Sequence, residues 1–142
     1  MTTDDIQRKL ILLPAGWAEE NAQSWERVIP YYQRLVFDNP NSKFRYLLDL
    51  VQTISKTEQV KLFKNYPSRE MLIISTSSMK EEPIYGDVFI VVGVIDETLT
   101  RIIYCHAEGG LESVDCRSNE IMSTLQALLD RLWAETRGKK SA

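Results

Sequence analysis

Cysteine and histidine are scarce in this sequence of 142 residues, which holds two cysteines and one histidine. A disulfide scaffold needs more cysteines than this, so a buried core must hold the fold together. Structural zinc sites usually show paired Cys or His ligands at short spacing, and the chain does not supply such pairs. We therefore expect no metal and no cofactor, and we interpret the protein as reduced and cytoplasmic.

Long apolar runs and an excess of positive charge are also missing. The longest apolar run, residues 89–95, is far shorter than the roughly 20 residues that cross a bilayer. Lysine and arginine number 17 against 20 acidic residues, and a net charge of −3 offers no basic field for nucleic acid. The opening residues, MTTDDIQRK, carry acids where a secretory signal carries positive charge. The sequence thus predicts a cytoplasmic protein that binds neither nucleic acid nor membrane.

What is present is the composition of a globular domain. The hydrophobic content of 44% and the charged content of 26% lie near the averages for folded proteins. A chain of this length can bury a core without cross-links. We find no internal repeat and no low-complexity linker, so residues 1–142 are predicted to form a single domain with a frayed tail at 137–142.

The N-terminal half is predicted to be mainly helical. Residues 8–13, RKLILL, form a short apolar run that favours a first strand, although a helical turn is possible at this length. Apolar residues from 17 to 36 recur at intervals of three and four, which indicates a helix. Pro30 should break or kink that helix near Val28. A second helix is predicted over residues 44–54 from the same spacing.

Strand patterns follow, and a helix ends the chain. We predict strands at 59–63, 71–76, 88–95 and 99–105, with a turn at 65–68. The run at 88–95 has little polar alternation, so it is the candidate for a central strand covered on both faces. Ser118 or Asn119 can cap a long amphipathic helix. Its apolar stripe comprises Ile121, Leu125, Leu128, Leu129, Leu132 and Trp133. The predicted fold is α+β, a mostly antiparallel sheet of four to six strands with two or three helices packed on one face.

The only histidine and both cysteines lie within residues 104–116, YCHAEGGLESVDC. Adjacent residues at a strand end point to opposite faces, so Cys105 and His106 cannot readily share one metal ion. Cys116 could approach His106 if residues 107–115 fold back as a tight loop, with the amides of Gly109 and Gly110 as oxyanion donors. One hypothesis is therefore a small enzyme or ligand-binding domain that uses the Cys105/His106/Cys116 loop.

Negative charge is concentrated in the C-terminal half. Residues 87–130 hold eight acidic residues and two arginines, a local net charge of −6. We expect residues 107–120 to form an exposed acidic loop and helix start, with no cation near its acids except Arg117. An acidic surface can steer a basic partner and quicken its association. The candidate contact residues in this stretch are Glu108, Glu112, Asp115 and Glu120.

Aromatic residues crowd the helical half of the sequence. Tyr31 and Tyr32 are consecutive, so they cannot both point into one core, and we expect Tyr31 or Tyr46 to be exposed. Exposed tyrosines are favoured at protein interfaces. Tyr31 and Tyr46 therefore complete the candidate partner-binding set.

The leading hypothesis is a small acidic module that masks or escorts a protein partner with a basic surface. Bacterial toxin-immunity proteins and secretion chaperones are of this size and charge, although no motif identifies a family. A homodimer that uses the apolar face of the first helices as its contact is a third hypothesis.

Overall fold

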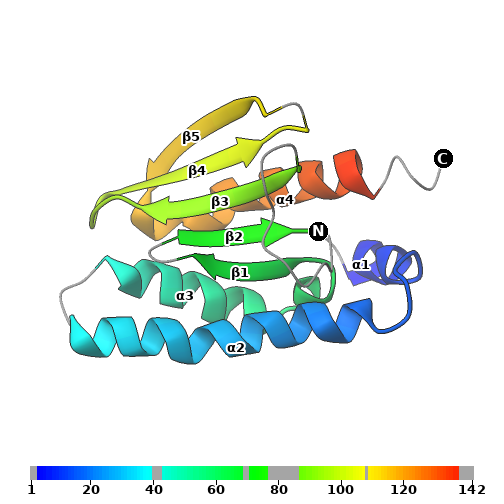
Figure 1. Cartoon of the computed structure of the whole chain (residues 1–142), viewed down its shortest axis with the longest axis horizontal. Coiled ribbons are helices and arrows are strands. Elements are labelled where there is room, and N and C mark those ends of the chain that lie inside the picture. The colour runs from blue at the N-terminus through cyan, green and yellow to red at the C-terminus, as the bar shows by residue number, and fades with distance from the viewer. Residues whose placement is uncertain (1–2, 40–42, 69–70, 77–86, 108, 138–142) are drawn as a thin grey trace.

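A computed structural model describes residues 3–39, 43–68, 71–76, 87–107 and 109–137. They form one five-stranded sheet whose antiparallel strands follow one another in the order β1-β2-β3-β4-β5 (Figure 1). In the described residues three α-helices precede the sheet and one follows it. The elements are α1 (Thr3–Leu10), α2 (Trp17–Asp38), α3 (Phe44–Ser55), η1 (Glu58–Lys61), β1 (Lys64–Ser68), β2 (Met71–Ser75), β3 (Phe89–Val94), β4 (Leu99–Cys105), β5 (Leu111–Arg117), η2 (Ser118–Glu120) and α4 (Ile121–Thr136).

The core lies between the helices and one face of the sheet, which we call the inner face. This face carries the buried side chains of Ile90, Ile102 and Tyr104, because alternate residues of a strand point to the same side. Helix α3 packs a stripe that includes Leu47 and Val51 into the same core. Figure 1 shows α4 crossing behind the strands, while α2 and α3 lie beside β1. The α+β architecture with helices on one face of an antiparallel sheet is therefore confirmed.

The strongest sequence patterns correspond to observed elements. The run at 88–95 forms β3, the central strand, whose inner face is buried and whose outer face is half-buried. The predicted strands at 71–76 and 99–105 appear as β2 and β4. The C-terminal helix is present as α4 and buries Ile121, Leu125, Leu129, Leu132 and Trp133, while Leu128 is half-buried. No side chain caps its start, so the predicted cap at Ser118 or Asn119 is wrong. Of the predicted tail, the structure describes only Arg137.

Two predictions in the N-terminal half are wrong. The expected strand at 8–13 is instead the end of helix α1 and the turn after it. Acids begin α1 and bases end it, which suits the helix dipole, and Lys9 pairs with Asp5 at 3.2 Å. Helix α2 runs without interruption through Pro30, so the predicted break is wrong. Pro30 is exposed, and the buried stripe on the opposite side holds the helix together.

Three further segments change their assignment. The expected strand at 59–63 is mostly the 3-10 helix η1, and the expected turn at 65–68 lies in strand β1. Pro67 is tolerated there because β1 is an edge strand, where a missing amide need not break the sheet. The expected acidic loop at 107–120 contains strand β5 and the 3-10 helix η2. β5 has no apolar alternation, because its side chains are exposed on both faces of the sheet edge.

Candidate functional site

Strand β5 forms the last edge of the sheet and pairs only with β4 in the described part of the chain. Six of its seven residues are exposed, and only Cys116 is half-buried. Two of the exposed side chains are apolar: Leu111 is 67% exposed and Val114 is 37% exposed. Exposed apolar side chains on an unpaired strand are a combination that proteins usually avoid unless another chain covers them.

The hydrogen-bond pattern fixes which backbone groups of β5 point outward. The amide of His106 donates to the Gly110 carbonyl, and the amide of Ser118 donates to the Thr98 carbonyl. Both bonds belong to the β4–β5 register, in which Ile102 lies opposite Val114. Bonded and non-bonded pairs alternate along an antiparallel ladder, so even-numbered residues of β5 bond to β4. The amides and carbonyls of the odd-numbered residues therefore point away from the sheet: Leu111, Ser113, Asp115 and Arg117.

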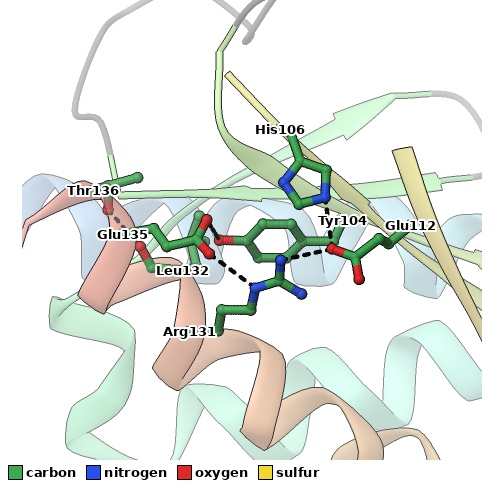
Figure 2. Close-up of polar contacts among 7 residues, drawn as sticks. All are labelled: Tyr104, His106, Glu112, Arg131, Leu132, Glu135 and Thr136. Carbon is green, nitrogen blue, oxygen red and sulfur yellow. Dashed lines mark hydrogen bonds and ion pairs between the residues drawn. The ribbon is translucent and has the colours of Figure 1, made fainter. Parts of the chain in front are cut away.

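A polar cluster ties the inner side of β5 to helix α4. Glu112 Oε2 lies 2.6 Å from Arg131 Nη2 and 2.6 Å from His106 Nε2. Figure 2 shows the Arg131 side chain rising from α4 between the carboxylates of Glu112 and Glu135. Arg131 Nε donates to Glu135 Oε1 at 3.0 Å, and the Tyr104 hydroxyl donates to Glu135 Oε2 at 2.8 Å. The cluster thus joins β4, the turn after it, β5 and α4.

Packing reinforces these polar contacts. The Arg131 guanidinium carbon lies 4.3 Å from the centre of the Tyr104 ring, a cation–π geometry. The Tyr104 and His106 rings are 5.2 Å apart between centroids. Tyr104 itself is buried in the core. One edge of the cluster is therefore fixed by the core, and the other reaches the exposed strand.

The charges of the cluster stabilise one another. The hydrogen bond from Arg131 is the main cause that lowers the pKa of Glu112, and the bond from Tyr104 is the main cause that lowers the pKa of Glu135. Burial, followed by the bond to Glu135, raises the pKa of Tyr104. Both carboxylates therefore stay ionised near neutral pH, where a general acid would need a raised pKa. The arrangement is suited to positioning β5 rather than to proton transfer.

Two of the predicted acids, Glu112 and Asp115, are not unpaired charges, and for these two the sequence interpretation is wrong. Glu112 is paired as described above, and Asp115 accepts hydrogen bonds from Arg101 Nε at 2.8 Å and Arg101 Nη2 at 3.1 Å. Arg101 lies directly opposite Asp115 in the ladder, a neighbour that a loop assignment could not reveal. Glu120 is exposed at the end of η2. Glu108 lies outside the described residues.

The two predicted tyrosines lie in different surroundings. Tyr31 is 38% exposed and packs edge-on against buried Tyr32, with ring centroids 5.2 Å apart. Tyr46 is half-buried and lines a groove of about 200 Å³ with residues that include Ser118 and Asn119, which directly follow β5. The structure therefore brings Tyr46 to one end of β5. Tyr31 lies on α2 beside Tyr32.

The structure does not bring the two cysteines to His106 as a reactive group. Cys105 lies opposite Leu111, and Cys116 lies opposite Thr100, five positions further along the ladder. At roughly 3.4 Å per residue this separates Cys116 from the His106 end of the strand by about 17 Å. Burial is the main cause that raises the pKa of both thiols, which disfavours the nucleophilic thiolate.

Sequence reasoning missed three residues that matter here: Arg101, Arg131 and Glu135. The spacing of Arg131 and Glu135 is the ordinary i, i+4 helix pair, and it was visible in the sequence. Their contact with β5 depends on tertiary packing. Among the described residues, no group of three or more His, Cys, Asp or Glu side chains is arranged to hold a metal ion.

None of the helices in the described residues combines the length and the apolar character needed to cross a membrane. A scan against protein-family models and searches of curated proteins and of solved structures found no match to this chain.

Proposed function

We propose that the protein is a binding module that masks or escorts another protein, and that the partner docks along the outer edge of β5. The observation that carries this proposal is the open edge itself. Four residues of β5 turn their backbone amides and carbonyls outward, and the strand has no second neighbour in the described chain. An extended segment that adds to such an edge gains affinity from main-chain hydrogen bonds and specificity from alternate side chains.

The anchoring of β5 supports this role. Arg101 holds Asp115 from the outer face, and Arg131 holds Glu112 from the inner face. An edge held in its extended conformation loses less conformational entropy when a partner strand binds. Glu112 and Asp115 are therefore proposed to position the docking strand, and their charges are largely satisfied within the protein.

The remaining negative charge supports a basic partner. Glu97 and Glu120 are exposed acids around the C-terminal end of β5 and the start of α4, and Asp130 is exposed further along α4. Tyr46 borders the groove near the same end. We propose that these acids steer the partner and that Tyr46 contacts it, in line with the role of aromatic anchors in slow dissociation.

The test is affinity capture from the native host with three purified baits: the parent, Ser113→Pro and Glu26→Lys. Proline at position 113 removes an outward amide and adds a bulky ring to the docking edge, but it leaves the bonds to β4 in place. Glu26 is exposed on α2 and serves as the surface control. We expect a partner that binds the parent and the Glu26→Lys control but not Ser113→Pro.

A captured protein is then titrated against purified Glu120→Lys and Glu26→Lys chains at two salt concentrations. Charge reversal at position 120 should slow association and weaken its salt dependence, while reversal at position 26 should change neither. Equal capture by the parent and Ser113→Pro contradicts docking on β5. Failure of all three baits to capture any protein contradicts the masking or escorting function.

A further inference from the structure

We infer that β5 also pairs with β5 of a second copy of this chain, in an antiparallel arrangement whose two-fold axis passes beside Val114. This inference goes beyond the proposed partner and does not depend on it, because purified protein alone is sufficient for the pairing. It also moves the homodimer contact from the first helices, where the sequence suggested it, to the sheet edge.

The backbone of β5 is self-complementary in this register. With Val114 opposite Val114 of the second copy, Ser113 lies opposite Asp115 and Leu111 lies opposite Arg117. The residues of these last two pairs all turn their amides and carbonyls outward. The opposed pairs can therefore exchange hydrogen bonds along the whole strand. A two-fold axis perpendicular to the sheet also keeps the inner faces of both copies on the same side. The result is one continuous antiparallel sheet.

Side-chain charge favours the same register. With Val114 on the axis, no two like charges lie directly opposite each other: Glu112 faces Cys116, and Asp115 faces Ser113. A shift that centres the pair on Asp115 opposes two carboxylates directly, which is unfavourable. A shift to Ser113 leaves Arg117 without a residue of β5 opposite it, because the strand begins at Leu111. The Val114 register is the one that pairs all seven residues of β5.

The exposed apolar side chains fit this arrangement. Val114 is 37% exposed and meets its own copy at a non-bonded position of the new ladder, where opposed side chains are closest. Leu111, 67% exposed, lies against the stem of Arg117 from the second copy. Pairing of a single strand gives a small interface of the weak, transient class. The dimer is therefore a reversible state that competes with a docked partner for the same edge.

Disulfide trapping tests the register. Non-bonded pairs of an antiparallel ladder bring the two Cα atoms to about 4.5 Å, within the range that a disulfide spans. In a Cys116→Ser background, Val114→Cys is expected to give a disulfide-linked dimer under mild oxidation. Met71→Cys in the same background is the matched control, because Met71 is 40% exposed and lies on β2, away from the edge. Ser113→Cys in the same background should cross-link most strongly only if the strands pair with Ser113 opposite Ser113, which is the shifted register.

Cross-linking of Val114→Cys well above both comparison chains supports the inference. Equal cross-linking of Val114→Cys and Met71→Cys overturns the pairing, and stronger cross-linking of Ser113→Cys overturns the register. Sedimentation velocity provides a second measurement that needs no cross-link. It compares Cys116→Ser, whose β5 carries no cysteine, with Cys116→Ser/Ser113→Pro across a concentration series. The first should shift toward the dimer as concentration rises and the second should stay monomeric; identical behaviour of the two also overturns the pairing.

Discussion

The two edge strands of the sheet, β1 and β5, both have an extended backbone, but they differ in what satisfies their outward backbone groups. At the β1 edge, α2 supplies the missing hydrogen-bond partners: Trp25 Nε1 donates to the Phe63 carbonyl at 2.7 Å, and Ser24 Oγ accepts from the Asn65 amide at 3.1 Å. Pro67 on the same edge has no amide to satisfy. At the β5 edge the outward groups belong to exposed residues, and Figure 1 shows no helix alongside them in the described chain.

The difference has an energetic cause. Asn21, Ser24 and Trp25 are buried on α2, and a buried polar group without a partner costs roughly 1–3 kcal/mol. The chain at and just before β1 supplies one partner for each of these side chains: Asn21 Nδ2 accordingly donates to the Lys61 carbonyl at 2.9 Å, while Asn21 Oδ1 has no partner in the described chain. The hydrogen bonds that cover the β1 edge and the burial of the polar side chains of α2 therefore depend on each other. β5 is exposed, so leaving its edge open costs little stability and keeps it available for pairing.

The largest expected effect is at the closed edge. Trp25→Ala removes a side chain that is 1% exposed and a hydrogen bond to the Phe63 carbonyl, so the free energy of unfolding should fall by about 3–5 kcal/mol. Urea denaturation followed by circular dichroism measures the change. Leu111→Ala at the open edge is the comparison and should stay within about 0.5 kcal/mol of the parent. Similar losses for the two variants would remove the energetic distinction between the edges.

The core beneath β3 and β4 should respond almost as strongly. Leu129 on α4 is 1% exposed and packs within the main cluster, so Leu129→Ala should cost about 2–5 kcal/mol. Thermal and urea unfolding give the value, and Ala127→Ser, at an exposed position of the same helix, is the control. A Leu129→Ala chain as stable as the parent would mean that α4 does not support the open edge through the core.

Proline substitutions sharpen the comparison within β5 itself. The Val114 amide points toward Ile102 on β4, so Val114→Pro should break a ladder bond and cost about 1–3 kcal/mol. The Ser113 amide points outward, so Ser113→Pro should cost clearly less. Both variants are compared by urea denaturation. A larger loss for Ser113→Pro would reverse the assignment of inward and outward groups.

Sequence patterns were sufficient to predict the elements whose residues are constrained by burial. The central strand β3 and the helices α3 and α4 carry continuous or periodic apolar runs, and all three were predicted. Both edge strands were missed, because an edge strand needs little apolar alternation: β1 contains Pro67, and β5 is exposed on both faces. Glu112, Asp115 and Glu120 are exposed as expected, but the first two lie in a strand rather than a loop, and both are paired. Arg101 and Arg131 reach Asp115 and Glu112 only through strand register and helix packing.

The smallest expected effect concerns pH, because ion pairs hold the open edge whereas uncharged hydrogen bonds close the other. The pKa of Glu112 is lowered chiefly by the bond from Arg131, and the pKa of Asp115 is lowered chiefly by the bond from Arg101. A carboxylate with a lowered pKa in the folded state stabilises the fold above its unfolded pKa, and this contribution is lost as pH falls through the folded value. The ordinary values are 4.5 for Glu and 3.8 for Asp, so the loss falls at about pH 4.5 and below. Native-state hydrogen exchange measures this loss when it is compared between pH 6 and the acidic range and corrected for intrinsic rates. The Val114 amide should lose more protection than the Asn65 amide. Glu112→Gln should reduce that difference. Equal loss at both amides would show that the ion pairs do not distinguish the two edges.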